Sequence, residues 1–310
     1  MSRILVAGEL NVDLVMSGLP ALPVLGQELI GTGFNIVMGS SSAITAARLA
    51  ALGAHVDFVG QIGSDDLGHF MLRELQTFGV GTQLIETIPN TNTDVTISLT
   101  YEHDRALMTF PGLMTTFAGQ SITPDLLANY THVHVGSFFL QTGLQAQLPA
   151  LFSRAHDLGL TTSLDTGWDP HQHWMQNPHL GPTLAETDYF FPNEKEALAL
   201  SDGTTALADR VGGTLIVKRG GDGASAIPAN SKHEQIDIAA LPVEVVDTTG
   251  AGDAFNAGFL YATIINRAAL PDALRFAVAC GAQAVTQVGG ATNAPTAEAI
   301  STHYLKRSTI

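Results

Sequence analysis

The stretch that decides the fold is Val245-Val246-Asp247-Thr248-Thr249-Gly250-Ala251-Gly252-Asp253-Ala254-Phe255. Its pattern predicts a short apolar strand, a turn with two glycines and an apolar helix. The glycines allow a sharp turn, and the free N–H groups at the start of a helix attract anions such as phosphate. A carboxylate repels phosphate, so Asp253 at this place suggests a chemical task, such as taking a proton from a hydroxyl. An ordinary helix start, capped by Thr248 or Thr249, is the alternative.

Length and composition limit the class of protein. The 310 residues, 45% of them hydrophobic, are enough for one large α/β domain with a small appendage. No apolar run approaches the ~20 residues that span a bilayer, and Met1-Ser2-Arg3 leads directly into a strand pattern instead of a signal peptide, so we expect a cytoplasmic protein. The single cysteine, Cys280, excludes an internal disulfide and is expected to be buried. A net charge of −15 argues against nucleic acid or an anionic membrane as partner.

Short apolar runs alternate with helical patterns along most of the chain. The runs predict buried strands at 3–8, 56–63, 162–165, 189–192 and 214–219, and the helical patterns fall at 44–53, 65–75, 193–198 and 273–285. Between residues 91 and 112 apolar and polar residues alternate around a turn at 102–105, which predicts a β-hairpin.

Two aspartates lie at or just after the ends of predicted strands. Asp13 comes shortly after the first strand, and Asp165 is the last residue of the strand predicted at 162–165. Open α/β sheets bind ligands outside the carboxyl ends of their strands, so Asp13 is a candidate for binding substrate hydroxyls and Asp165 for bordering the cleft. A loop carboxylate in water is the alternative for Asp13.

Two histidine pairs have i, i+2 spacing. They are His132 with His134, and His171 with His173. Neither pair has nearby Cys or further His to complete a transition-metal site, so we interpret both as structural or surface residues.

The segment Asp-Thr-Thr-Gly-Ala-Gly-Asp-Ala-Phe at 247–255 resembles the C-terminal signature of the PfkB, or ribokinase-like, family of ATP-dependent sugar and nucleoside kinases. The resemblance implies a three-layer α/β/α domain over residues 1–310, with a mostly parallel central sheet and a small β-sheet lid. The lid elements fall at about 13–34 and 91–112, and the lid of this family often pairs two subunits, so a homodimer is expected. A lid excludes water, which keeps a kinase from hydrolysing ATP. In the family's manner, Asp253 would be the catalytic base, and the amides of Gly250, Ala251 and Gly252 would form the anion hole.

The stretch from Gly39 to Ile44 resembles the family's N-terminal signature, Gly-Gly, two variable residues, then Ala-Asn. In the family the second Gly and the Asn touch the sugar, and here Ser40 and Ile44 occupy those places. Isoleucine cannot hydrogen-bond a hydroxyl, so a more apolar or differently shaped substrate is favoured. The residues assigned to the substrate are Asp13, Gly39, Ser40, Ile44 and Asp165.

The resemblance also assigns residues to the nucleotide and to two cations. Asn193 and Glu196 match the family's Asn-x-x-Glu motif near Mg²⁺, which Glu196 would hold through a water. This spacing is weak alone, because carboxylates are common in a first helical turn. The residues expected to bind ATP are Asn193, Lys218, Gly220, Gly223 and Asn256.

Residues 286–291 follow a predicted helix and would form a wall of the adenine pocket. In the family, backbone carbonyls of this region and the signature turn can hold a monovalent cation, so K⁺ is expected to stimulate the enzyme. The matching positions are Asp247, Thr249, Ala284, Gln287, Gly289 and Asn293.

Other functions remain to be weighed against a kinase. A non-catalytic sugar or nucleoside sensor on the same fold stays open because of Ser40 and Ile44. A dinucleotide-dependent oxidoreductase is disfavoured, because Gly250-Ala251-Gly252 lacks the third glycine of that motif. A P-loop kinase is excluded by the absence of any Gly-Lys pair. The sequence leaves the substrate open among sugars, sugar acids, polyols and nucleosides.

Overall fold

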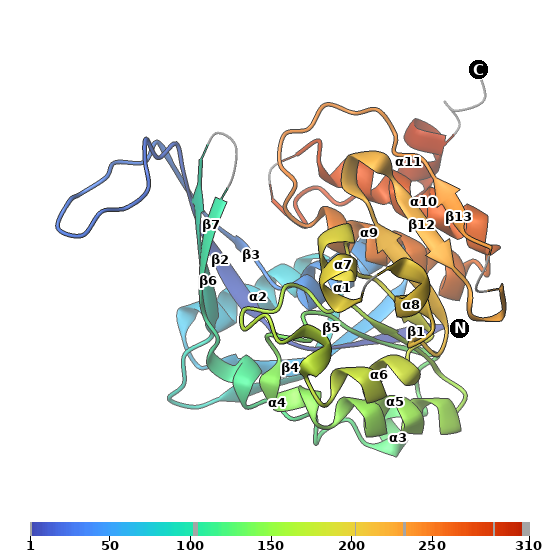
Figure 1. The fold of residues 1–310 in the computed structure, drawn as a ribbon. Coiled ribbons are helices and arrows are strands. Elements are labelled where there is room, and N and C mark those ends of the chain that lie inside the picture. The colour runs from blue at the N-terminus through green and yellow to red at the C-terminus, as the bar shows by residue number, and fades with distance from the viewer. Residues whose placement is uncertain (1, 102–104, 202, 232–233, 288, 306–310) are drawn as a thin grey trace.

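A computed structural model describes residues 2–101, 105–201, 203–231, 234–287 and 289–305. Its central sheet has the strand order β13-β12-β11-β10-β9-β8-β1-β4-β5 (Figure 1). The seven strands from β11 to β5 in this order pair in parallel. At the other edge, β12 pairs antiparallel with β11, and β13 pairs antiparallel with β12. The strands are β1 Arg3–Ala7, β4 His55–Gly63, β5 Gly81–Ile88, β8 His132–Val135, β9 Thr161–Leu164, β10 Tyr189–Phe190, β11 Thr214–Lys218, β12 Ala224–Ile227 and β13 Ile236–Ile238.

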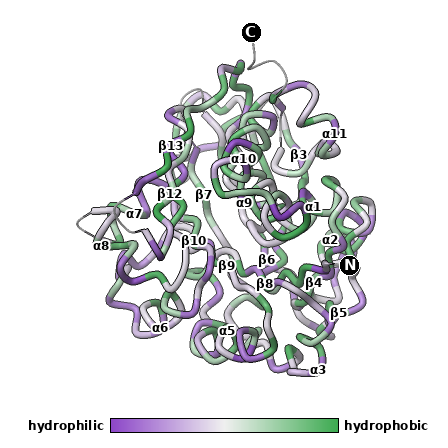
Figure 2. The backbone as a smooth tube through the Cα atoms, turned by 90° about the vertical axis from the view of Figure 1, so that its right-hand side faces the viewer, coloured by the Kyte–Doolittle hydropathy of each residue, from purple (hydrophilic) through white to green (hydrophobic). Residues whose placement is uncertain are grey.

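Helices cover both faces of this sheet. Alternate residues of β1 show why, since Ile4 and Val6 belong to one hydrophobic core and Leu5 and Ala7 to the other. One core holds α1 Ser41–Ala51, α2 Asp66–Thr77, α9 Ala251–Leu260, α10 Leu270–Ala284 and α11 Ala297–Ile300. The other holds α3 Pro124–Leu127, α4 Thr142–Gln145, α5 Leu148–Asp157, α6 Leu180–Ala185, α7 Glu194–Leu200 and α8 Thr204–Ala208. Figure 2 shows hydrophilic stretches mainly on the outer turns of the tube.

Short 3₁₀ or π segments complete the fold, at Gly112–Thr115, Trp174–Gln176, Gly220–Asp222, Ala229–Ser231, Tyr261–Ile265 and Ser301–Leu305. No helix in the described ranges is long and apolar enough to cross a membrane.

A second, smaller sheet has the order β3-β2-β6-β7 and projects from the body at the left of Figure 1. It consists of β2 Asn11–Ser17, β3 Gly33–Met38, β6 Asp94–Thr100 and β7 Arg105–Phe110, with β2 and β6 parallel and the other pairs antiparallel. Asp13, Thr96 and Thr109 lie in register, so they share one face. The other face exposes apolar side chains of Phe34, Ile36, Ile97, Met108 and Phe110.

The three-layer α/β/α fold predicted from the sequence is confirmed, with two local differences. The strand expected at Val245 and Val246 is wrong: these side chains are 61% and 56% exposed, and Val246 N–H donates to the carbonyl of Val285 at the end of α10 (2.7 Å) instead of to a strand. Asp13 lies inside β2 and not in the loop after β1. The hairpin at β6 and β7 forms as expected, with the centre of its turn, 102–104, outside the described residues.

One histidine pair is buried in the central sheet and the other lies at the surface, in agreement with their interpretation as structural or surface residues. His132 and His134 are buried in β8, where both rings hydrogen-bond to the hydroxyl of Ser163 at 2.8 and 2.7 Å. Burial lowers the pKa of His134 to about 4, so this ring is neutral at pH 7. His171 and His173 stack on each other at the surface. Cys280 is a buried free thiol.

Candidate active site

The N-terminus of α9 is open to a ligand. Gly250 precedes the helix in a left-handed conformation (φ 72°), and no described side chain caps the helix. The alternative of an ordinary start capped by Thr248 or Thr249 therefore does not hold. A Cβ at Gly250 would collide with the backbone of Gly290, so the close approach of these two turns requires glycine. The geometry suits an anion held by backbone amides.

Asp253 lies in the first turn of α9, partly open to solvent. Its Oδ1 accepts a hydrogen bond from the hydroxyl of Ser41 at 2.5 Å. Burial and the nearby charge of Asp165 raise the pKa of Asp253 to about 7, against the lowering effects of Ser41 and Lys218. A carboxylate with a pKa near 7 is suited to act as a general base at neutral pH.

A buried ion pair lies beside this turn. Lys218 Nζ is 2.5 Å from Asp165 Oδ2, and the side chains are 13% and 6% exposed. Asn256, on α9, donates to the same carboxylate oxygen at 2.6 Å, and Gly167 N–H donates to the other oxygen at 3.0 Å. Burial alone would raise the pKa of Asp165, but the charge and hydrogen bond of Lys218 hold it below its usual range.

The ion pair places a cation beside the open amides. A Cβ at Gly252 would lie 3.3 Å from Lys218 Nζ, so the ammonium group packs against the glycine of the turn. The structure thus brings Lys218, Asn256 and Asp165 together next to Asp253. The carboxylate of Asp165, expected at the substrate, is engaged in holding Lys218.

The polar face of the small sheet supplies Asp13. Asp13 Oδ1 accepts from Asn11 Nδ2 at 2.9 Å, and burial raises the pKa of Asp13 to about 6. Gly39 lies directly against this carboxylate, because a Cβ at Gly39 would overlap with Asp13 and Asn11. Arg105, the first residue of β7, donates from Nη1 to Thr249 Oγ1 at 2.7 Å. Arg105 therefore joins the small sheet to the turn that precedes α9.

Ser40 and Ile44 are both buried, at 7% and 3% exposure. The Ser40 hydroxyl donates to the carbonyl of Glu9 at 2.7 Å and accepts from Ala43 N–H at 2.9 Å, which caps α1. Ile44 belongs to the core and packs against Gly290. Both side chains are thus engaged within the protein, and their contact with a substrate stays a prediction.

Asn193 and Glu196 form a capping box at the start of α7. Asn193 Oδ1 accepts from Glu196 N–H at 2.9 Å, and Glu196 Oε2 accepts from Asn193 N–H at 2.8 Å. Burial and the charge of Asp165 raise the pKa of Glu196 to about 7. Gly220 and Gly223 shape the turn after β11 with φ of 53° and 93°. The binding of ATP by this turn and Lys218 stays a prediction.

Asp247 connects two turns. Its Oδ1 accepts from Thr249 N–H and its Oδ2 from Gly289 N–H, both at 2.9 Å. Burial alone would raise the pKa of Asp247, but these backbone hydrogen bonds bring it below the usual range. Asp247 thus ties the turn before α9 to the turn after α10, and a monovalent cation at these turns stays a prediction.

The remaining positions assigned to the monovalent cation lie on or after α10. Ala284 is buried in α10, and Asn293 has a left-handed backbone (φ 49°). The carbonyl oxygen of the Gln287 side chain is buried without a hydrogen-bond partner among the described residues. An unpaired buried oxygen suits a cation or a ligand donor.

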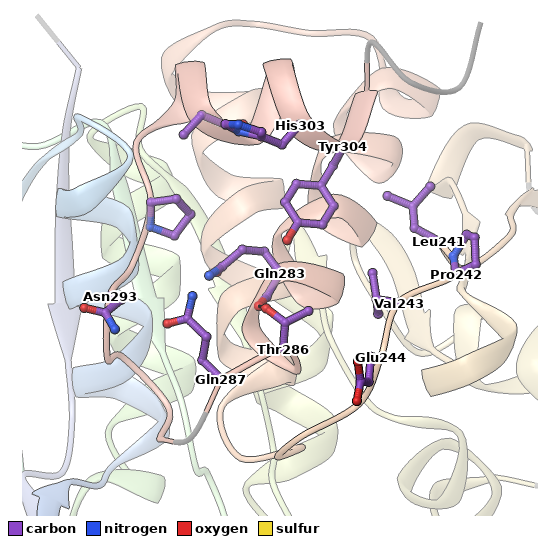
Figure 3. A pocket seen from close by; sticks show the side chains of 12 residues that line it. Leu241, Pro242, Val243, Glu244, Gln283, Thr286, Gln287, Asn293, His303 and Tyr304 are labelled. Carbon is purple, nitrogen blue, oxygen red and sulfur yellow. Dashed lines mark hydrogen bonds between the residues drawn. The ribbon is translucent and has the colours of Figure 1, made fainter. Parts of the chain in front are cut away.

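A cavity of about 640 Å³ lies beside these turns (Figure 3). Its walls come from the 241–244 segment, the end of α10 and the 293–304 segment; they include Val243, Gln283, Thr286, Gln287, Asn293, His303 and Tyr304. Its volume is typical of a site for a small organic ligand. Neither Asp13 nor Asp253 lines it, and none of the five residues expected to bind ATP does, so its use by the adenine of ATP stays a prediction.

Sequence reasoning missed three polar residues of this region. Ser41 stands at a variable position inside the N-terminal signature, but nothing in the sequence relates it to Asp253. Arg105 stood in a predicted turn with no sign that it reaches Thr249. Arg48 is buried in α1, where Nε and Nη2 donate to the carbonyl of Gly290 at 2.9 and 2.8 Å. Its position on the inner face of an amphipathic helix was the only available signal.

Comparison with known proteins supports this architecture. Residues 1–297 match the pfkB family of carbohydrate kinases. The chain is 31% identical to an ATP-dependent ribose-1-phosphate kinase of Halopiger xanaduensis over 99% of both chains, and 28% identical to the ribokinase of Bacillus subtilis over 96% of this chain and 97% of that one. A ribokinase II of E. coli, solved in complex with ATP and Mg²⁺, superimposes with a TM-score of 0.85 at 25% identity, covering 99% of this chain and 100% of that one.

The chain belongs to the pfkB family of carbohydrate kinases. The resemblance seen in the sequence is therefore confirmed, and with it the prediction of a phosphotransferase that uses an alcohol group of a small sugar, sugar derivative or nucleoside as acceptor. ATP and Mg²⁺ as cofactors are supported by the E. coli complex.

Proposed function

We propose that this kinase binds its acceptor between the polar face of the small sheet and the N-terminus of α9, and that Asp253 is its base. The observation that carries the proposal is the placement of Asp253. It has a pKa of about 7 and lies in the first turn of a helix whose N-terminus no described side chain caps. A base and an anion site are thereby brought together, as transfer of a phosphoryl group to a hydroxyl requires.

In the proposed step Asp253 takes the proton of the acceptor hydroxyl while the hydroxyl oxygen forms a bond to the γ-phosphorus of ATP. The bond between that phosphorus and the β,γ-bridging oxygen breaks, and ADP leaves. The amides at Gly250, Ala251 and Gly252, with Lys218 behind them, stabilise the charge on the transferring group. Arg105, from β7, brings a guanidinium group to this turn, where its Nη1 lies 2.7 Å from Thr249 Oγ1. Mg²⁺, when bound, neutralises phosphate charge, and Glu196 would hold it through a water.

Acceptor recognition is assigned to Asp13, which is anchored by Asn11 and lies next to Gly39. A carboxylate with several lone pairs binds vicinal hydroxyls of a sugar ring well. Because Ser40 and Ile44 are engaged inside the protein, we infer that the acceptor is held mainly from the small sheet. The relatives named above act on ribose or ribose-1-phosphate, which makes pentoses and their phosphates the first acceptors to examine.

The small sheet is proposed to act as the lid of one domain that spans the chain, and as the contact between two copies of it. One face of this sheet carries Asp13, Thr96 and Thr109, and the other exposes Phe34, Ile36, Ile97, Met108 and Phe110 at 38–57%. Contiguous exposed apolar side chains are typical of a protein interface. We expect a homodimer in the cytoplasm, with no nucleic acid or membrane partner, given the net charge of −15.

A screen for ATP consumption tests the proposal, with sugars, sugar phosphates, sugar acids, polyols and nucleosides as acceptors. We expect acceptor-dependent ADP release by the wild type and not by Asp253→Asn. A sensor would bind an acceptor, as seen by calorimetry, without ADP release. That result would overturn the kinase assignment of this site. The homodimer is tested separately by sedimentation of Phe110→Asp, which should shift the protein toward monomer if the lid is the contact.

A further inference from the structure

Helix α1 touches the proposed base directly. Ser41, the first residue of α1, donates its hydroxyl proton to Asp253 Oδ1 at 2.5 Å. One turn later, Thr45 Oγ1 lies 3.5 Å from the backbone carbonyl of Asp253. Two successive turns of α1 therefore face the same residue of α9.

The N-terminus of α1 is itself firmly held. The Ser40 hydroxyl bonds to Glu9 and Ala43, and the Ser42 hydroxyl donates to the buried carboxylate of Glu9 at 2.7 Å. Ser40 has a positive φ of 68°. This conformation costs free energy in residues other than glycine, and it persists only when neighbouring contacts fix it. The backbone of Ser41 is thus set from both sides, and so is the direction of its hydroxyl.

We propose that Ser41 is the positioning residue of the base. It occupies one oxygen of the Asp253 carboxylate, which leaves Oδ2 to accept the proton of the acceptor hydroxyl. This inference rests on the proposed role of Asp253. A serine hydroxyl that donates its only proton to a carboxylate favours the ionised form, which is the form that acts as a base.

Four other charged groups face Asp253. Asp165, after β9, and Glu9, after β1, disfavour its ionisation, whereas Lys218, at the end of β11, favours it. Arg48 on α1 also interacts with it, since Asp253 supports the charge of that guanidinium. None of these four is hydrogen-bonded to the Asp253 carboxylate within the described part of the chain, so Ser41 supplies a contact that the others do not replace.

The test is the pH dependence of kcat/KM for Ser41→Ala, with Ser41→Thr as the variant that retains the hydroxyl. Loss of a hydrogen bond to a charged group raises the pKa of Asp253, and we expect the acid limb to move up by about one pH unit. From a pKa of about 7, activity would fall about fivefold at pH 7 and hardly at all at pH 9. Ser41→Thr should return the acid limb of the kcat/KM profile to its wild-type position. Ser153→Ala, in α5 on the opposite face of the sheet, is the control and should leave the limb in place.

A second measurement does not depend on turnover. Carboxyl carbon NMR of aspartate-labelled protein, with the Asp253 signal assigned by its absence in Asp253→Asn, gives the pKa of Asp253 directly. A higher pKa in Ser41→Ala, and an unchanged pKa in Ser153→Ala, is the expected result. An unchanged pKa in Ser41→Ala, or an equal loss of activity at every pH, would overturn the assignment of Ser41. Failure of the kinase assignment itself would appear differently, as absence of turnover in the wild type while the NMR shift remains.

Discussion

Replacement of Lys218 by methionine tests whether the ion pair beside α9 holds the site together. Lys218→Met keeps the length of the side chain and removes its charge, so Asp165 loses its cation while it stays buried. Removing one partner of a buried pair costs about 3–5 kcal/mol, because an uncompensated charge remains in the interior. Asp253 and Glu196 would also lose the cation that favours their ionised forms.

The magnitude can be expressed as a melting temperature. An unfolding entropy of about 2.1 cal/mol/K per residue corresponds to about 0.65 kcal/mol/K for 310 residues. A cost of about 3–5 kcal/mol then lowers the Tm by about 5–8 °C. Circular dichroism of the ligand-free protein measures this shift. The double variant Lys218→Met/Asp165→Asn should lose less than the sum of the two single variants, because both charges are then gone.

The control is Arg275→Met, which breaks a pair of similar length at the surface. Arg275 Nη1 lies 2.7 Å from Asp272, and these side chains are 55% and 67% exposed. Exposed pairs contribute about 0–1 kcal/mol, so the Tm should hardly change. If Lys218→Met is as stable as Arg275→Met, the ion pair does not support the site and the argument from burial is refuted.

Three further results are expected. K⁺ should raise turnover above that in Na⁺ or a large organic cation at equal ionic strength, because the resemblance to the family assigns a monovalent cation to the two turns that Asp247 connects; equal rates would count against this. Ile44→Asn should lower the free energy of unfolding by about 2–4 kcal/mol and create no ribose-type recognition, since the side chain is buried against Gly290; ribose-type recognition that appears in this variant with native activity untouched would contradict the inference that the acceptor is held without position 44. Arg105→Gln should lower kcat/KM about tenfold or more with the Tm preserved, as its guanidinium reaches the turn at Thr249; unchanged kinetics would leave Arg105 without a role in transfer.

The sequence was a good guide to elements with strong local signals. Strand β1 and helix α9 follow from an apolar run and from a glycine turn before an apolar helix, and both formed where expected. Val245 and Val246 wrongly predicted a strand. They lie in an irregular segment whose backbone hydrogen-bonds to the end of α10. Periodicity reports which residues prefer burial, not which backbone they pair with.

Contacts between segments that lie far apart in the chain could not be predicted from the sequence. Ser41 and Asp253 are 212 residues apart, and Arg105 and Thr249 are 144 apart. Such pairs depend on how α1 packs against α9 and how the small sheet stands over the body, which no local pattern encodes. Asp165 shows the same limit, since its place at the end of a strand was predicted, whereas its ion pair with Lys218 was not.

The most direct test of the account is the kinetics of Asp253→Asn. Asparagine keeps the shape of the side chain and removes its basicity, so kcat should fall by about 10²–10⁴-fold. ATP affinity should hold or improve, because a negative charge near the phosphates disappears, and circular dichroism should match the wild type. A folded Asp253→Asn protein that binds ATP and turns over within about threefold of the wild type would contradict the assignment of Asp253 as the base.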